Sequence, residues 1–200
     1  VRKCADLLRL QNEAAGKPLA VGIVRGQKPN AVRVESYTYV VSGTDEPVDP
    51  APIIRTVTIW PATANEPAAV LTDGKLAANY GPVLPNGIVG GVYKVELGTA
   101  VEVVSVTTWS YNQNGNRGAQ KFVLFGSESA QDPGWDPGKY TPIASVDTTG
   151  KPAAEYEATS IRAAAYKPLG TFRRLIWVVQ PVTTLRENTA FQEFEIKSIP

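Results

Sequence analysis

Two segments of the sequence combine aromatic rings with planar hydrogen-bonding side chains. Sugar recognition needs this combination, because an apolar sugar face stacks on an aromatic ring while amides and guanidinium groups bond to the hydroxyls. The segment WSYNQNGNRG (109–118) ends a predicted strand, and SAQDPGWDPGKY (129–140) holds a tryptophan between two Pro-Gly turns. The candidate ligand-binding residues in these segments are Trp135, Tyr111, Asn112, Asn114, Asn116 and Arg117.

Both segments also have a purely structural interpretation. The pair Asn114-Gly115 is a strong hairpin-turn signal, so the surrounding asparagines can be turn formers only. Arg117 can fix its loop by bonding to carbonyl oxygens, and Trp135 can plug the bottom of a barrel. The residue types alone leave both interpretations open.

The composition argues against catalysis. The chain has no histidine, which removes the usual general base near neutral pH and excludes a Ser-His-Asp or Cys-His arrangement. The carboxylate pairs Asp132/Asp136 and Glu193/Glu195 each lie in one short segment, whereas a glycosidase needs two carboxylates across a cleft, about 5 to 10 Å apart. Neither phosphate-binding glycine motif is present. We therefore expect a binding protein and not an enzyme.

Charge and hydropathy limit the partners. Lys plus Arg is 20 and Asp plus Glu is 19, so the net charge is +1 and there is no global field to hold nucleic acid. No apolar run approaches the ~18 residues of a membrane span. Cys4 is the single cysteine and cannot form an internal disulfide. The start at Val1 and the lack of methionine favour a processed chain or a fragment of an extracellular protein.

Periodicity predicts one helix followed by strands. Apolar residues recur at helical spacing in 3–15, and Gly16 and Pro18 end that pattern. The run 19–24 and the alternating segment 31–41 read as strands, and the Pro-rich, acidic segment 44–52 reads as an extended connection. We therefore predict an N-terminal helix and strand extension over 1–45 and a separate domain over 46–200.

The second part is predicted to be all-β. Short β-branched and aromatic runs alternate with Gly, Pro, Asn and Asp clusters, without intervening helices. About eight such strands predict an antiparallel β-sandwich or jelly roll. Trp60 and Trp177 lie in or at the end of these runs, so we expect both in the core, and Trp109 can also be core. The predicted strands are 53–60, 90–98, 102–111, 120–127, 141–148, 157–166, 172–182 and 190–199.

The order of these pieces resembles the discoidin family, the coagulation factor 5/8 C-terminal (F5/8 type C) or galactose-binding-like domains. Five stretches carry the resemblance over about 145 residues: LTDGKLAANYG (71–81), YKVELGTAVEVVSVTTW (93–109), KFVLFGSES (121–129), LGTFRRLIWVV (169–179) and FQEFEIKSI (191–199). The stretches NRGAQKF (116–122) and DPGW (132–135) are also similar to discoidin-like domains in large extracellular proteins of planctomycete-type bacteria.

The resemblance implies a jelly roll with ligand loops at one end, and a structural Ca²⁺. In this sequence the implied metal ligands are Asp73, the backbone carbonyls around Leu71, and Glu193, which would give Ca²⁺ the hard oxygens that it prefers. Lys75 departs from the family pattern, because a cation near Asp73 can compete with the metal or replace it. The alternative is that Asp73 is a turn residue before Gly74 and that Glu193 is an exposed strand residue.

Two functions follow from the resemblance. The first is a carbohydrate-binding module of a secreted or cell-surface protein, with a glycan or cell-surface polysaccharide as its partner. The second is a structural, assembly or adhesion module that contacts other protein subunits, since open strand edges can add a partner strand. The fold by itself does not choose between them.

Overall fold

The computed structural model describes an all-β chain. The described residues are 32–39, 53–63, 65–76, 80–88, 90–150, 155–163, 167–182 and 188–199. The predicted helix at 3–15, the run 19–24, the connection 44–52 and Cys4 lie outside them. The proposed boundary between 45 and 46 therefore stays a prediction.

All the predicted strand segments from residue 53 onward lie in strands of the sheet, with ends shifted by a few residues, and two of them, 90–98 and 102–111, belong to one strand. The segment 31–41 also contains a strand. The strands are β1 (Val32–Tyr39), β2 (Thr56–Trp60), β3 (Gly91–Tyr111), β4 (Lys121–Ser127), β5 (Thr141–Asp147), β6 (Tyr156–Ala163), β7 (Gly170–Val179) and β8 (Phe191–Ser198). Two short 3₁₀ turns, η1 (Ala68–Thr72) and η2 (Pro137–Lys139), complete the regular structure of the described residues. In this part of the chain no helix has the length and apolarity of a membrane span.

Strand β3 builds the sandwich, because its two halves lie in different layers. Residues 91–96 pair with β2 and β7, and residues 103–111 pair with β6 and β8, all antiparallel. The register shifts between Glu96 and Val101, where Gly98 adopts a φ of +82°. Two separate strands were predicted here. The structure corrects this, because the residues around Gly98 form a bulge that bends the strand without reversing it.

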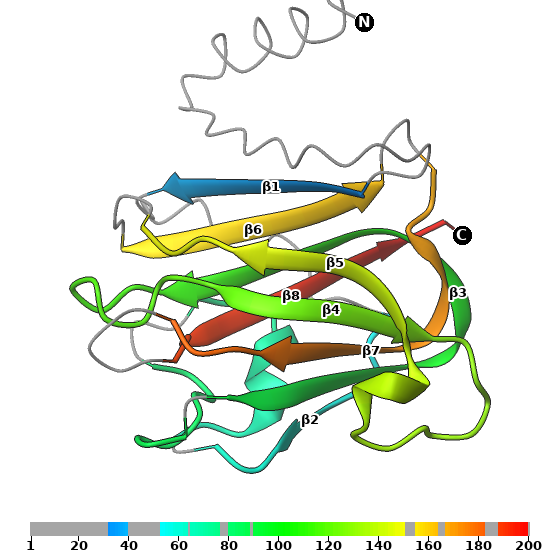
Figure 1. The fold of residues 1–200 in the computed structure, drawn as a ribbon, viewed down its shortest axis with the longest axis horizontal. Helices are drawn as coiled ribbons and strands as arrows, with labels where there is room; N and C mark the ends of the chain where they lie inside the picture. The colour runs from blue at the N-terminus through cyan, green and yellow to red at the C-terminus, as the bar shows by residue number, and fades with distance from the viewer. Residues whose placement is uncertain are drawn as a thin grey trace, which may run out of the picture.

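The layers follow from this bend. One layer has the order β2-β3-β7-β4-β5, and the other has β8-β3-β6-β1 (Figure 1). Strand β1, which lies in the predicted N-terminal extension, pairs with β6 over eight residues and so adds a strand to the second layer. The central strand β7 is covered on both faces, as its continuous apolar run predicted.

The core between the layers is aromatic. Trp177 stacks on Phe194 with ring centroids 4.5 Å apart, and Tyr93 meets Phe191 and Phe194 edge-on. Leu71, from η1, is fully buried and helps to close the side of the sandwich between β8 and β2. Trp177 is therefore core, as predicted.

The prediction for Trp60 is wrong. Its side chain is 52% exposed. In β2 the alternation turns Val57 and Ile59 toward the core and leaves Thr58 and Trp60 on the outer face. The short apolar run before Trp60 correctly predicted a strand. Trp60, however, lies on the outer face of that strand and not on the core face that we expected.

Candidate functional site

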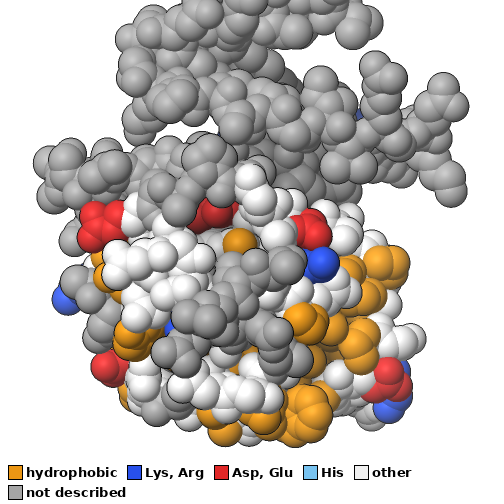
Figure 2. All heavy atoms as spheres, turned by 60° about the vertical axis from the view of Figure 1, so that its left-hand side comes forward, with side chains coloured by type: hydrophobic (Ala, Val, Ile, Leu, Met, Phe, Trp, Pro, Cys, Tyr) orange, Lys and Arg blue, Asp and Glu red, His pale blue; other side chains and the backbone are white. Residues whose placement is uncertain are grey.

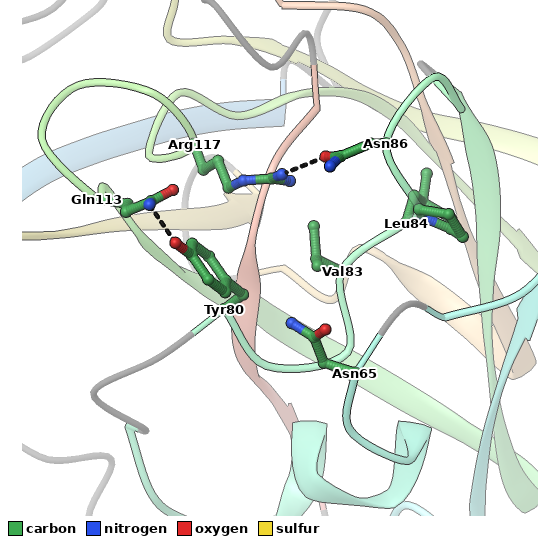
Figure 3. A pocket seen from close by; sticks show the side chains of 8 residues that line it. Asn65, Tyr80, Val83, Leu84, Asn86, Gln113 and Arg117 are labelled. Carbon is green, nitrogen blue, oxygen red and sulfur yellow. Dashed lines mark hydrogen bonds between the residues drawn. The ribbon is translucent and has the colours of Figure 1, made fainter.

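A pocket lies at the end of the sandwich that carries the 112–120 loop (Figures 1 and 3). Its volume is about 220 Å³. Its walls come from the loop after β2, the segment 80–88 that precedes β3, and the loop after β3. The described lining residues are Asn65, Tyr80, Val83, Leu84, Pro85, Asn86, Gln113 and Arg117.

Arg117 joins the loop after β3 to the segment 80–88. Its side chain is 6% exposed, and its Nη2 donates to Oδ1 of Asn86 at 2.8 Å. Its Nη1 donates to Oδ1 of the fully buried Asn188, whose own Nδ2 donates to the carbonyl of Leu84 at 3.2 Å. The planar guanidinium is thus held between two amide oxygens, which fixes its direction.

Tyr80 and Gln113 form the opposite wall. Nε2 of Gln113 donates to the hydroxyl of Tyr80, and the guanidinium of Arg117 lies 5.3 Å from the Tyr80 ring centroid (Figure 3). The other amide atom, Oε1 of Gln113, is buried and has no hydrogen-bond partner among the described residues. A buried acceptor without a partner calls for an explanation, and a ligand hydroxyl is one.

Hydrogen bonds hold the backbone of two segments that line the pocket. The hydroxyl of Tyr93, in β3, donates to the carbonyl of Pro82 at 3.1 Å, and burial raises the pKa of Tyr93, so this hydroxyl keeps its proton. The carbonyl of Asn112 accepts from the N–H groups of Asn116 (3.0 Å) and Arg117 (3.1 Å), which closes the loop on itself. The polar side chains of the pocket are therefore held in place before any ligand binds.

The predicted residues of this loop have different positions. Arg117 lines the pocket, whereas Asn112 is 8% exposed and is packed against Gly118. Asn114 is exposed at the tip of the loop with a φ of +56°, and Asn116 is half-buried. Tyr111 is half-buried, with its ring centroid 5.4 Å from that of Tyr156. The turn-forming interpretation thus describes the backbone of this loop, and Arg117 also contributes to the pocket wall.

Trp135 does not line the pocket, and the segment that carries it begins at the other end of the sandwich. The segment 128–140 follows β4 there and folds over the outer face of the first layer (Figure 1). Trp135 is half-buried against the cluster around Ile176 and Tyr140, and Nζ of Lys94 lies 4.2 Å from its ring centroid. Lys94 also bonds to Asp132 at 2.6 Å. The structure does not bring Trp135 together with Arg117.

Two of the predicted metal ligands, Asp73 and Glu193, lie close together. Glu193 is fully buried, and neither of its carboxylate oxygens has a hydrogen bond of ordinary geometry within the described part of the chain. The pKa of Glu193 is raised to about 9, mainly by burial; the charges of Asp73 and Glu195 add to this rise, and the nearby N–H groups of Gly74 and Asp73 oppose it. The idea of Glu193 as an exposed strand residue is therefore wrong.

The loop facing Glu193 has the shape of a tight turn. Oδ1 of Asp73 accepts from the N–H of Lys75 at 3.0 Å, and Gly74 has a φ of +78°. No group of three or more acidic or cysteine side chains converges in the described ranges, so backbone carbonyls must supply most ligands of any metal here. Two carboxylates with loop carbonyls are a donor set that fits Ca²⁺, and a cation would offset the cost of burying the carboxylate of Glu193.

Four polar residues of the pocket were not predicted: Asn65, Tyr80, Asn86 and Gln113. They come from three separate segments, and no spacing in the sequence links these segments. A weak signal existed for two of them. Asn86 lies in the turn sequence Pro-Asn-Gly, and Gln113 lies inside the loop already chosen for its asparagines.

Comparisons with known proteins support the fold. No protein-family model matches the chain, and no curated protein matches it. A solved structure of the CBM32-1, CBM32-2 and M60 catalytic domains of Clostridium perfringens ZmpB matches with a TM-score of 0.55 and 14% identity, over 84% of this chain and 17% of that chain.

Two smaller structures match over nearly their whole length. Chitosan-binding module 1 of a chitosanase/glucanase from Paenibacillus sp. IK-5 has a TM-score of 0.50 and 19% identity, over 75% of this chain and 98% of that chain. CBM32-1 of a family 31 glycoside hydrolase from Clostridium perfringens has a TM-score of 0.50 and 13% identity, over 75% and 100%. The chain therefore has the antiparallel β-sandwich fold of these modules, which confirms the fold class predicted from the sequence.

Proposed function

We propose that this chain is a non-catalytic carbohydrate-binding module of an extracellular protein and that the pocket around Arg117 is its sugar site. The observation that carries the proposal is the pairing of a fixed donor with an unsatisfied acceptor. Arg117 is held by Asn86 and Asn188, and Oε1 of Gln113 is buried without a partner on the same pocket. A sugar hydroxyl both donates and accepts, so it complements this pair.

The size and lining of the pocket agree with a sugar ring. A cavity of about 220 Å³ is small for a drug-sized ligand and is open to solvent through loops. Val83, Leu84 and Pro85 give one apolar side, while the amides of Asn65 and Asn86 stand at other positions of the rim. Polar groups fixed around an apolar wall are the usual composition of a site that orients a small polar ligand.

The described lining residues include no carboxylate. A glycosidase would need an acid and a base or nucleophile on either side of the bound sugar. The buried carboxylate of Glu193 lies instead beside the loop of Asp73, where it serves a different site. The pocket therefore supports binding without bond cleavage.

The fold neighbours favour the same function, carbohydrate binding, by analogy. One is named as a chitosan-binding module, and others are CBM32 domains of a glycoside hydrolase and of a protein with an M60 catalytic domain. By this analogy the chain would hold a larger secreted protein, or its substrate, at a glycan surface. The pocket residues of this chain, and not the analogy, define which sugar is bound.

We also propose that Ca²⁺ occupies the site of Asp73 and Glu193, with carbonyls near Leu71 completing the coordination. The metal would neutralise a carboxylate that is otherwise buried without a partner. Its role would be structural, since η1 packs against β8 and β2 and leads directly into this loop.

A glycan array probed with three forms of the chain tests the sugar site. Gln113→Ala removes the unsatisfied acceptor, and Asn114→Ala is the matched control, because Asn114 is the next residue but is exposed and does not line the pocket. The proposal predicts that wild type and Asn114→Ala bind the same glycans and that Gln113→Ala loses them. Binding by all three forms alike would reject the pocket, and binding by none would reject the function.

A further inference from the structure

One large aromatic side chain is exposed on the outer face of the first layer, at the end of β2 from which the chain leads to the pocket. Trp60 and Ile199 are the large hydrophobic residues that are mostly exposed in the described part of the chain, at 52% and 44%. Trp60 ends β2, and the alternation of that strand turns its indole to the outside. An exposed tryptophan is not explained by packing, since the core faces of Val57 and Ile59 already anchor the strand.

The backbone of Trp60 and the pocket residue Leu84 both lie close to Gly91. A side-chain carbon at Gly91 would lie 2.6 Å from the carbonyl oxygen of Trp60 and 3.0 Å from a methyl group of Leu84. Leu84 lines the pocket, so the strand end that carries Trp60 packs directly behind the pocket wall. Only glycine at position 91 allows this approach, because any Cβ would collide with the Trp60 backbone.

The chain leads from Trp60 into the pocket. Residues 61–63 follow the strand, and Asn65 is already part of the lining. Five residues span at most about 18 Å when extended, so Trp60 lies within that distance of Asn65. Figure 2 shows hydrophobic side chains gathered along the lower rim of this end, the level at which β2 lies in Figure 1.

The pocket itself has little aromatic surface to offer. Tyr80 is half-buried, the guanidinium of Arg117 is 5.3 Å from its ring centroid, and its hydroxyl accepts from Gln113. Hydrogen bonds orient a sugar, but much of the binding free energy of such sites comes from stacking on an aromatic face. The pocket supplies the hydrogen bonds, and Trp60 has the exposed aromatic surface for stacking.

We infer that Trp60 is a stacking platform for a further sugar ring, so that the site recognises an oligosaccharide chain running from the Arg117 pocket over the end of β2. This inference rests on the proposed function, since it extends the same site. It assigns the ligand class: glycans of two or more residues are bound more tightly than the corresponding monosaccharide.

Two ladders of sugars test the inference. The probes are galactose with its β-1,4-linked di- to tetrasaccharides and galacturonic acid with the matching oligomers, titrated calorimetrically into the whole chain. We expect the affinity to rise about tenfold from the monosaccharide to the longer members of the ladder that binds. Trp60→Ala removes this rise and leaves monosaccharide affinity unchanged, whereas Trp60→Tyr retains most of it.

Thr58→Ala is the control, because Thr58 is exposed on the same face of β2 but lies two residues farther from the pocket. It should leave the whole ladder unchanged. Tryptophan emission gives a second measurement: the tetrasaccharide shifts the spectrum to the blue, and Trp60→Tyr abolishes the shift. Equal affinity along the ladder, or oligomer binding unaffected by Trp60→Ala, overturns the role of Trp60 and leaves the pocket standing. If neither ladder binds and the glycan array also finds no ligand, both the pocket and the role of Trp60 are overturned.

Discussion

Nη2 of Arg117 donates to Oδ1 of Asn86 across 31 positions of sequence, at 2.8 Å. This bond joins the loop after β3 to the segment before it, and the pocket lies between the two. The same guanidinium also holds Asn188, from the segment before β8. One side chain therefore fixes the three segments that meet around the proposed sugar site.

Changes at Arg117 should separate binding from folding. In Arg117→Lys the ammonium can keep the charge but cannot hold two amides in a plane, so we expect at least a tenfold loss of sugar affinity with a folded chain. Arg117→Ala also leaves the buried Asn188 oxygen unsatisfied and should lower stability by roughly 1–3 kcal/mol. Calorimetric titration and thermal melts measure the two effects. A Lys variant with wild-type affinity would show that sugar binding does not depend on the planar guanidinium.

The charge of the pocket should select among sugars. Arg117 is the charged side chain among the described lining residues, so a cationic sugar is repelled and a neutral or acidic one is accepted. We expect N-acetylglucosamine oligomers to bind more tightly than glucosamine oligomers of equal length, with the gap narrowing at high salt. Tighter binding of the glucosamine series would contradict this assignment. The comparison is informative because one fold neighbour is named as a chitosan-binding module.

Calcium should stabilise the chain through Glu193. If the ion binds the folded state alone, a calcium concentration a hundredfold above its Kd adds about 2.7 kcal/mol. Thermal melts in CaCl₂ and in EDTA measure this, with MgCl₂ as a control because Mg²⁺ fits flexible carbonyl sites poorly. Glu193→Gln should melt at the same temperature in both solutions. A wild-type chain that is also insensitive to calcium would reject the metal site.

In EDTA the stability of the metal-free chain should fall as the pH rises. Burial raises the pKa of Glu193 to about 9 from an ordinary 4.5, so the folded state keeps a proton that the unfolded state releases. This contribution is complete below pH 4.5 and is lost as the pH approaches 9. Melting temperatures of wild type and Glu193→Gln across this range test it. Parallel curves for the two forms would show that Glu193 does not titrate as described.

Trp135→Ala should affect stability and leave sugar binding unchanged. Trp135 is half-buried against the cluster around Ile176, and Lys94 lies over its ring, so its removal should cost roughly 1–3 kcal/mol. Its distance from the pocket predicts an unchanged affinity. Loss of glycan binding with an intact melt would instead place the sugar site at the opposite end of the sandwich.

The sequence predicted the strands well because each buries one face. Alternation in 93–97 and the continuous apolar run in 172–179 follow directly from half-buried and fully covered strands. The continuity of β3 was missed, since a bulge at Gly98 and a tight turn have the same Leu-Gly signal. The exposure of Trp60 was missed because a strand end has the same hydrophobicity whichever face it presents.

The site was less predictable than the fold. Arg117, from its loop, lines the pocket, and Asp73 lies close to Glu193, the pair that the family resemblance indicated; their roles in binding stay predictions. The partners Tyr80, Asn86 and Gln113 depend on how loops from different strands converge, which no local pattern encodes. Trp135 is a residue type that often stacks on sugars, but it packs against apolar residues on the outer face of the first layer.

The most direct test of the sugar site is a crystal structure of the chain with the best glycan from the array. We expect a sugar ring in the pocket, with a hydroxyl between Arg117 and Oε1 of Gln113. A glycan found only at the Trp135 end, or a pocket that stays empty while the glycan binds elsewhere, would contradict it.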